Sequence, residues 1–129
     1  MSATTSGLAA VGVGAVLGAW LRWGLGAWLN PMLPELPLGT LAANAVGGLL
    51  IGVAIQLFAD HPGIPPEMRL FVITGFLGAL TTFSTFSAEA VALLARAQWT
   101  WAAAHIGSHL FASISLTIAG MYAVRWLKG

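Results

Sequence analysis

The stretch TGFLGALTTFSTFS, residues 74–87, differs most from the rest of a strongly apolar chain. Gly75 and Gly78 are followed by five hydroxyl residues among the seven positions 81–87. Gly, Ser and Thr are weak helix formers, and Ser and Thr side chains compete for backbone hydrogen bonds. We therefore predict that a helix passing through this stretch breaks near residues 78–84.

The composition around this stretch is that of an integral membrane protein. Hydrophobic residues make up 58% of the 129 residues and charged residues 7%, whereas a soluble domain has roughly 25% charged residues. The mean hydropathy is +0.87. These values exclude an ordinary soluble domain and a disordered chain, and the absence of Cys excludes a disulfide scaffold. A net charge of +1 excludes nucleic-acid binding by charge attraction.

Charged residues and turn residues divide the chain into apolar spans. The predicted spans are residues 7–29, 38–59, 70–95 and 98–124. Each is long enough for a transmembrane helix, which needs about 20 residues. Pro and Gly residues separate the first three spans, whereas only Arg96 marks the last boundary. We expect an all-α, multi-pass membrane protein in which residues 1–129 form a single four-helix transmembrane domain.

The positive charges give little preference for either orientation in the membrane. Arg69, Arg125 and Lys128 would lie on one side, and Arg96 and Arg22 on the other. One interpretation is that so small a count carries no information. The other is dual topology, in which both orientations insert and pair as an antiparallel dimer.

The predicted helix break suggests an ion site inside the membrane. Non-helical backbone survives there only when protein covers it or it lines a wet cavity, and it exposes carbonyls for cations and N–H groups for anions. Phe83 and Phe86 are three residues apart and project to one side of a helical turn. They could pack in the core or face lipid, or their positive ring edges could contact an anion.

The second span places one polar residue among small ones. Asn44, Gly48 and Gly52 recur every four residues and share a helix face. The G-x-x-x-G patterns at residues 14–18 and 48–52 indicate close helix packing. Asn44 is a candidate functional residue, because an amide in lipid is costly unless it is hydrogen-bonded.

The fourth span carries a polar track. His105, His109, Ser113 and Thr117 recur every four residues. Two His residues four apart could bind a metal, but no third ligand lies in the same stretch. A pore wall or hydrogen bonds between helices is favoured instead.

Two charged residues lie deeper in the spans than the others. Arg22 could reach the interface by snorkelling or line a vestibule, and Glu89 is expected to face a vestibule or a partner. The chain has no carboxylate pair, no Ser-His-Asp set and no phosphate loop, so we do not expect an enzyme.

Several motifs resemble those of the Fluc/CrcB family of fluoride channels. They are GTLAAN (residues 39–44), GFLG (75–78) running into TTFSTFSAE (81–89), and GAWLRW (18–23). The resemblance covers nearly the whole chain in order. It implies a dual-topology, antiparallel homodimer with four spans per chain and a third helix broken mid-membrane. Such a dimer exports toxic cytoplasmic fluoride passively through two antiparallel pores in the bacterial inner membrane.

The resemblance also implies roles for individual residues. The fluoride pathway would comprise Asn44, Phe83, Phe86, Ser84, Thr85, His109, Ser113 and Thr117. Arg22 and Glu89 would be vestibule and motif charges. A structural Na+ (sodium) ion at the dimer centre would be held by backbone carbonyls of Gly78 and Thr81. The partners would be fluoride, membrane lipid and a second copy of the chain, although pairing with a paralogue stays open, and no nucleic acid.

His105 departs from the family pattern, because some relatives carry Tyr at this position. If His105 faces the pore, conduction would depend on pH, since imidazole changes charge near physiological pH.

The chemistry of these residues suits fluoride, which is small and strongly hydrated. A pore must replace its water with hydrogen-bond donors such as the Asn44 amide and the hydroxyls of Ser84, Thr85 and Ser113, and a fixed cation would hold the ion too tightly.

Two other functions remain as alternatives. A small dual-topology multidrug-type transporter would need a carboxylate in the first span, which has none. A non-transporting membrane assembly subunit would leave the polar third and fourth spans without use.

Overall fold

The computed structural model describes residues 4–129, and these residues form helices and no strands. The elements are α1 (Thr5–Leu29), the short 3₁₀ turn η1 (Asn30–Met32), α2 (Leu38–Asp60), α3 (Pro66–Arg69), the π-helical η2 (Leu70–Leu77), α4 (Gly78–Leu80), α5 (Phe83–Ala95) and α6 (Trp99–Lys128). Within this range, four helical segments are long and apolar enough to cross a membrane: Thr5–Met32, Leu38–Asp60, Pro66–Ala95 and Trp99–Lys128. The predicted all-α class with membrane-length helices is therefore confirmed, and the segments lie within a few residues of the predicted spans.

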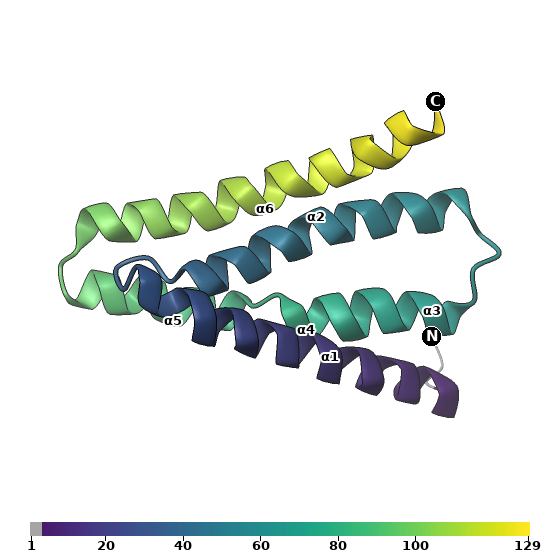
Figure 1. The fold of residues 1–129 in the computed structure, drawn as a ribbon, viewed down its shortest axis with the longest axis horizontal. Helices are drawn as coiled ribbons and strands as arrows, with labels where there is room; N and C mark the ends of the chain where they lie inside the picture. Colours follow the sequence, from purple (N-terminus) through teal and green to yellow (C-terminus); the bar gives the residue numbers. More distant parts are fainter. Residues whose placement is uncertain (1–3) are drawn as a thin grey trace.

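The four segments run alternately in opposite directions, so the start of α1 and the end of α6 lie at the same end of the molecule (Figure 1). α2 packs chiefly against α6, and α1 packs chiefly against the third segment, which comprises α3, η2, α4 and α5. Large apolar side chains such as Trp126, Leu127 and Phe111 are mostly exposed on the outside. An exposed apolar surface of this kind requires lipid or a protein partner to cover it.

The G-x-x-x-G patterns lie where helix backbones approach most closely. A Cβ atom on Gly18 would collide with the carbonyl oxygen of Phe76, and one on Gly52 would collide with that of Thr117. The packing role predicted for these patterns is confirmed. Only glycine allows α1 to approach the third segment, and α2 to approach α6, at this distance.

The third segment is interrupted between α4 and α5. Thr81 (φ −84°, ψ 155°) and Thr82 (φ −149°, ψ 123°) are extended rather than helical. The Thr82 hydroxyl caps the new helix by accepting a hydrogen bond from the Thr85 N–H at 3.0 Å. Both residues lie inside the stretch 78–84, where the hydroxyl-rich sequence disfavours a helix.

The turn between α5 and α6 uses a Schellman motif. Ala97 adopts a left-handed conformation (φ 55°), its N–H donates to the Leu94 carbonyl at 3.0 Å, and the Gln98 N–H donates to the Leu93 carbonyl at 2.9 Å. Glycine usually occupies this position. The sequence marks the boundary weakly because Ala97 takes the place of that glycine.

Candidate functional site

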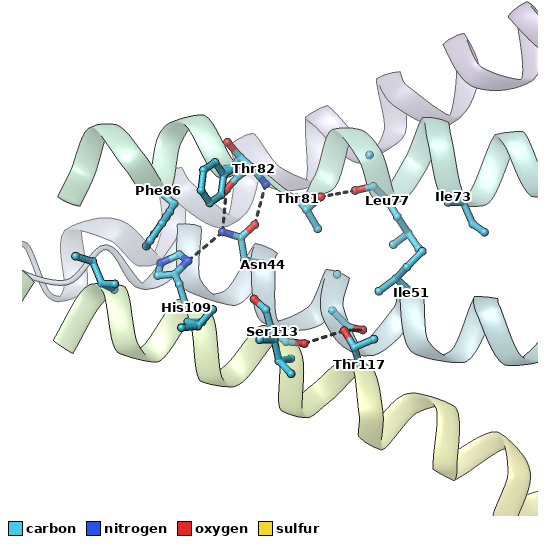
Figure 2. A pocket seen from close by; sticks show the side chains of 17 residues that line it. Asn44, Ile51, Ile73, Leu77, Thr81, Thr82, Phe86, His109, Ser113 and Thr117 are labelled. Carbon is cyan, nitrogen blue, oxygen red and sulfur yellow. Dashed lines mark hydrogen bonds between the residues drawn. The ribbon is translucent and has the colours of Figure 1, made fainter. Parts of the chain in front are cut away.

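A groove of about 600 Å³ runs along the face shared by α2, α6 and the helix break. Its walls are mostly apolar, and its polar groups come from Asn44, Thr81, Thr82, His109, Ser113 and Thr117 (Figure 2). Asn44 lies on α2, Thr81 and Thr82 lie at the break, and the other three residues lie on α6, so the groove joins residues that are far apart in the sequence.

Asn44 holds the backbone of the helix break in place. Its Oδ1 accepts a hydrogen bond from the Thr82 N–H at 2.8 Å, and its Nδ2 donates to the Thr82 carbonyl at 3.0 Å (Figure 2). Nδ2 also lies 3.0 Å from His109 Nδ1. Because the Thr82 contacts fix which end of the amide is the donor, His109 Nδ1 must accept this bond. A neutral His109 therefore carries its proton on Nε2.

The break leaves two backbone carbonyls without their α-helical partners. The Thr82 N–H, which would bond the Gly78 carbonyl in a continuous helix, donates to Asn44 instead. The Thr85 N–H, which would bond the Thr81 carbonyl, donates to the Thr82 hydroxyl. The carbonyl oxygens of Gly78 and Thr81 are thus available to a cation, and carbonyl oxygens of broken helices suit Na+.

A second, smaller cavity of about 260 Å³ lies on the other side of Thr82, which lines both. Arg22, Asn30, Thr40 and Thr85 contribute its polar groups. Arg22 Nε donates to the Ala79 carbonyl at 2.9 Å, another carbonyl next to the break. Arg22 is therefore bound into the protein at this site rather than simply extended to the membrane surface.

Glu89 lies in a buried polar cluster beside the groove. The Thr40 hydroxyl donates to Glu89 Oε2 at 2.7 Å, and His105 Nε2 lies 3.5 Å from Glu89 Oε1. His105 is fully buried, with Nε2 also 3.3 Å from the Phe86 carbonyl, and it does not line the groove. His105 therefore faces Glu89 and the backbone of α5 rather than the groove.

The aromatic rings of Phe83 and Phe86 lie between the cluster around Glu89 and the groove. Phe86 packs against Phe83 and against His109, with ring centroids 5.6 Å and 4.7 Å apart. The Phe83 side chain remains 78% exposed although it lines the groove. In the single chain, the part of the groove wall that Phe83 forms is therefore left uncovered.

Most of the predicted site residues lie together along the groove: Asn44, Phe83, Phe86, His109, Ser113, Thr117, Gly78 and Thr81. Arg22 and Thr85 line the smaller cavity, whereas Glu89 and the exposed Ser84 line neither. The Thr117 hydroxyl already donates to the carbonyls of Gly48 and Ser113, at 2.9 Å and 2.8 Å.

Two residues of this region were not among the predicted site residues. Thr82 provides the backbone that Asn44 binds, and Thr40 binds Glu89. Both lie inside the motifs at residues 39–44 and 81–89, which was the one signal that could have identified them. Their partners lie on other helices, so the motifs alone do not assign these contacts.

Membrane-length helices and a groove with polar groups at a helix break define this chain as a small multi-pass membrane protein. The family described as "CrcB-like protein, Camphor Resistance (CrcB)" matches residues 9–121, and the chain belongs to this family.

Relatives are similar over almost their entire length. A protein of Thiobacillus denitrificans named "Fluoride-specific ion channel FluC" is 59% identical over 119 residues, covering 92% of this chain and 96% of the relative. Proteins of the same name from Nitrosospira multiformis and Pseudomonas paraeruginosa are 61% and 54% identical over 120 residues, covering 93% of this chain and 94% of each relative.

Proposed function

We propose that the chain forms a fluoride-specific ion channel, not an enzyme, and that it lets toxic cytoplasmic fluoride leave the cell passively. The observation that carries the proposal is the Asn44 contact to both backbone groups of Thr82, which holds a helix break open beside the groove. Relatives with 54–61% identity are named as fluoride-specific ion channels, which supports the same ion for this chain.

The groove offers hydrogen-bond donors but no fixed cation. The first N–H group of α5, at Phe83, which lines the groove, has no partner within its helix and lies at the positive end of the helix dipole. His109 Nε2 is buried beside the groove and has no hydrogen-bond partner among the described residues, and the Ser113 side chain lines the groove. Such donors replace the water of fluoride without the strong binding of a Lys or Arg side chain.

Both N–H bonds of the Asn44 amide are already used, one by Thr82 and one by His109. We infer that Asn44 acts on fluoride by positioning the break and the His109 ring. The edges of the Phe83 and Phe86 rings, which carry partial positive charge, would then contact the ion as it passes.

The functional unit in this proposal is an antiparallel homodimer in the bacterial inner membrane. One chain leaves its groove open on one side, since Phe83 is 78% exposed there. A second copy would close this side, and two copies in opposite orientations would form two antiparallel pores. The near balance of Arg and Lys between the two ends of the molecule favours insertion in both orientations.

A Na+ ion at the centre of the dimer is part of the same proposal. Thr81 and Thr82 lie at the middle of the 30-residue segment Pro66–Ala95, which argues for a break at mid-membrane depth. The unpaired carbonyls of Gly78 and Thr81 from both copies would hold the ion. Its role would be structural, because it joins the two broken helices.

The decisive experiment is ion efflux from liposomes that contain the purified protein. We expect fluoride to leave rapidly and chloride to stay inside, as followed with ion-selective electrodes, while protein-free liposomes retain both ions. Equal efflux of chloride and fluoride, or no efflux of either, would contradict the proposal.

A further inference from the structure

We propose that Glu89, His105 and His109 form a binding site for a divalent transition metal such as Zn2+. One ligand atom from each of these side chains lies within 4.8 Å of the other two. His105 and His109 are four residues apart on α6 and share a helix face, and the third ligand comes from α5. Zn2+ readily takes imidazole nitrogen and carboxylate oxygen, with three protein ligands and a fourth position open.

Each of the three side chains has a buried polar atom that makes no hydrogen bond, and Glu89 Oε1 has only its 3.5 Å contact to His105 Nε2. Glu89 Oε1, His105 Nδ1 and His109 Nε2 are buried and have no hydrogen-bond partner among the described residues. Unpaired buried polar atoms cost free energy, and atoms of three neighbouring side chains are seldom left so by chance. A metal ion bound by Glu89, His105 and His109 would give at least one of these unpaired atoms a partner.

The site borders the groove. His105 and His109 are 0% and 4% exposed, and His109 also lines the groove, whereas Glu89 and His105 do not. A hydrated metal ion would therefore enter along the groove and exchange its water for His109 first. This site is separate from the proposed Na+ site, which consists of backbone carbonyls, and metal binding does not depend on fluoride conduction.

Metal binding would compete with the contact between Asn44 and His109. The Asn44 amide donates to His109 Nδ1, so the proton of the neutral ring lies on Nε2. A metal ion at Nε2 would move this proton to Nδ1, where it would face the Asn44 N–H. The two states therefore exclude each other, and a bound metal would remove both the Asn44 contact and the proton on His109 Nε2.

The test is metal titration of the purified protein in detergent, with the affinity tag removed and bound metals stripped by a chelator. Zn2+ binding is followed by calorimetry, and Co2+ is followed by the visible absorption of its tetrahedral complexes. We expect one site per chain. Glu89→Gln and His105→Tyr should each weaken binding at least about tenfold, because each removes one of three ligands.

His61→Ala is the matched control, because His61 is the remaining histidine and lies in the loop after α2, outside the cluster. It should leave the affinity unchanged. Size-exclusion elution and helical circular dichroism identify any variant that fails to fold. Absence of the Co2+ absorption in the unaltered protein, full affinity in both ligand variants, or loss of binding in His61→Ala would overturn the site.

Asn44→Asp tests the competition separately. A carboxylate at position 44 would accept a proton from His109 Nδ1, so Zn2+ should bind several-fold more tightly, whereas a purely structural Asn44 would give weaker or equal binding. Equal or weaker binding in this variant would overturn the competition. Binding is measured without fluoride, so its failure leaves the channel proposal standing, and failure of fluoride efflux leaves the metal site standing.

Discussion

Asn44 is the residue on which the geometry of the groove depends most. Its amide makes three hydrogen bonds of 2.8–3.0 Å, to both backbone groups of Thr82 and to His109. Oδ1 accepts one of these bonds and Nδ2 donates the other two, so exchanging the amide oxygen and nitrogen would break both contacts to Thr82.

Asn44→Asp should reduce fluoride efflux at least about tenfold. The variant loses both N–H donors, places a carboxylate against the Thr82 carbonyl and adds a negative charge that repels fluoride; an unsatisfied buried group costs about 1–3 kcal/mol. Liposome efflux measures the effect. Gln56→Glu adds the same charge far from the groove, on a residue bonded to Arg125, and should leave efflux unchanged. Normal efflux through Asn44→Asp would show that the Thr82 contact is dispensable.

Phe83→Ile should also slow fluoride efflux strongly, by about tenfold or more, because Ile keeps an apolar side chain but has no positive ring edge. Phe111 is a matched control: it is 72% exposed on α6, similar to Phe83 at 78%, and lies outside the groove. Phe111→Ile should conduct normally. If both variants conduct like the unaltered protein, the ring edges do not contact the ion.

At the scale of elements, glycine determines how closely helices approach. Gly18→Ala should lower the free energy of unfolding by about 1–3 kcal/mol, because its Cβ collides with the Phe76 carbonyl. Gly12, on the same helix, has open space around the position of a Cβ. Gly12→Ala should leave the thermal unfolding midpoint unchanged or raise it slightly. Equal midpoints for the two variants would mean that α1 can shift without cost.

The turn between α5 and α6 allows a stabilising change. Ala97→Gly should raise the free energy of unfolding by about 1 kcal/mol, because Ala97 has φ 55° and the left-handed conformation penalises a Cβ. Ala104→Gly, at an exposed position within α6, should lower it by about 1 kcal/mol. Thermal unfolding in detergent compares the two. A lower midpoint for Ala97→Gly would indicate that the Ala97 methyl group makes a needed contact.

The elements themselves could largely be predicted from the sequence, whereas the contacts between them could not. The length of the apolar runs predicts the four membrane-length helices, and the hydroxyl residues after Gly78 predict a break in the region where Thr81 and Thr82 are extended. That Asn44 would bond the Thr82 backbone, 38 residues away, depends on the rotation of α2 about its axis. The contact between Glu89 and His105 likewise depends on how α5 and α6 are rotated about their axes. A search of the α6 sequence for a third ligand beside His105 and His109 therefore could not find Glu89, the third ligand of the proposed metal site.

At the scale of the whole molecule, the proposed Na+ ion links the two copies. Replacing Na+ with a large organic cation during purification should dissociate the dimer or abolish fluoride efflux, because the carbonyls of Gly78 and Thr81 would lose the ion that holds them together. Size-exclusion chromatography and liposome efflux provide the two measurements. Replacing Na+ with K+ at equal ionic strength distinguishes a specific Na+ site from general screening of charge. If the dimer and the fluoride efflux are the same in Na+, K+ and the organic cation, the Na+ ion is not part of the channel.

The contact between Asn44 and Thr82 constrains evolution unequally at its two ends. The hydrogen bonds of Asn44 to Thr82 involve only backbone atoms, so any residue other than proline at position 82 can satisfy them. Capping of α5 alone then favours Thr, Ser, Asp or Asn. At position 44, Asp lacks the donor and Gln is one methylene longer. A lineage can therefore exchange residue 82 among capping residues in single steps, while residue 44 is confined to asparagine.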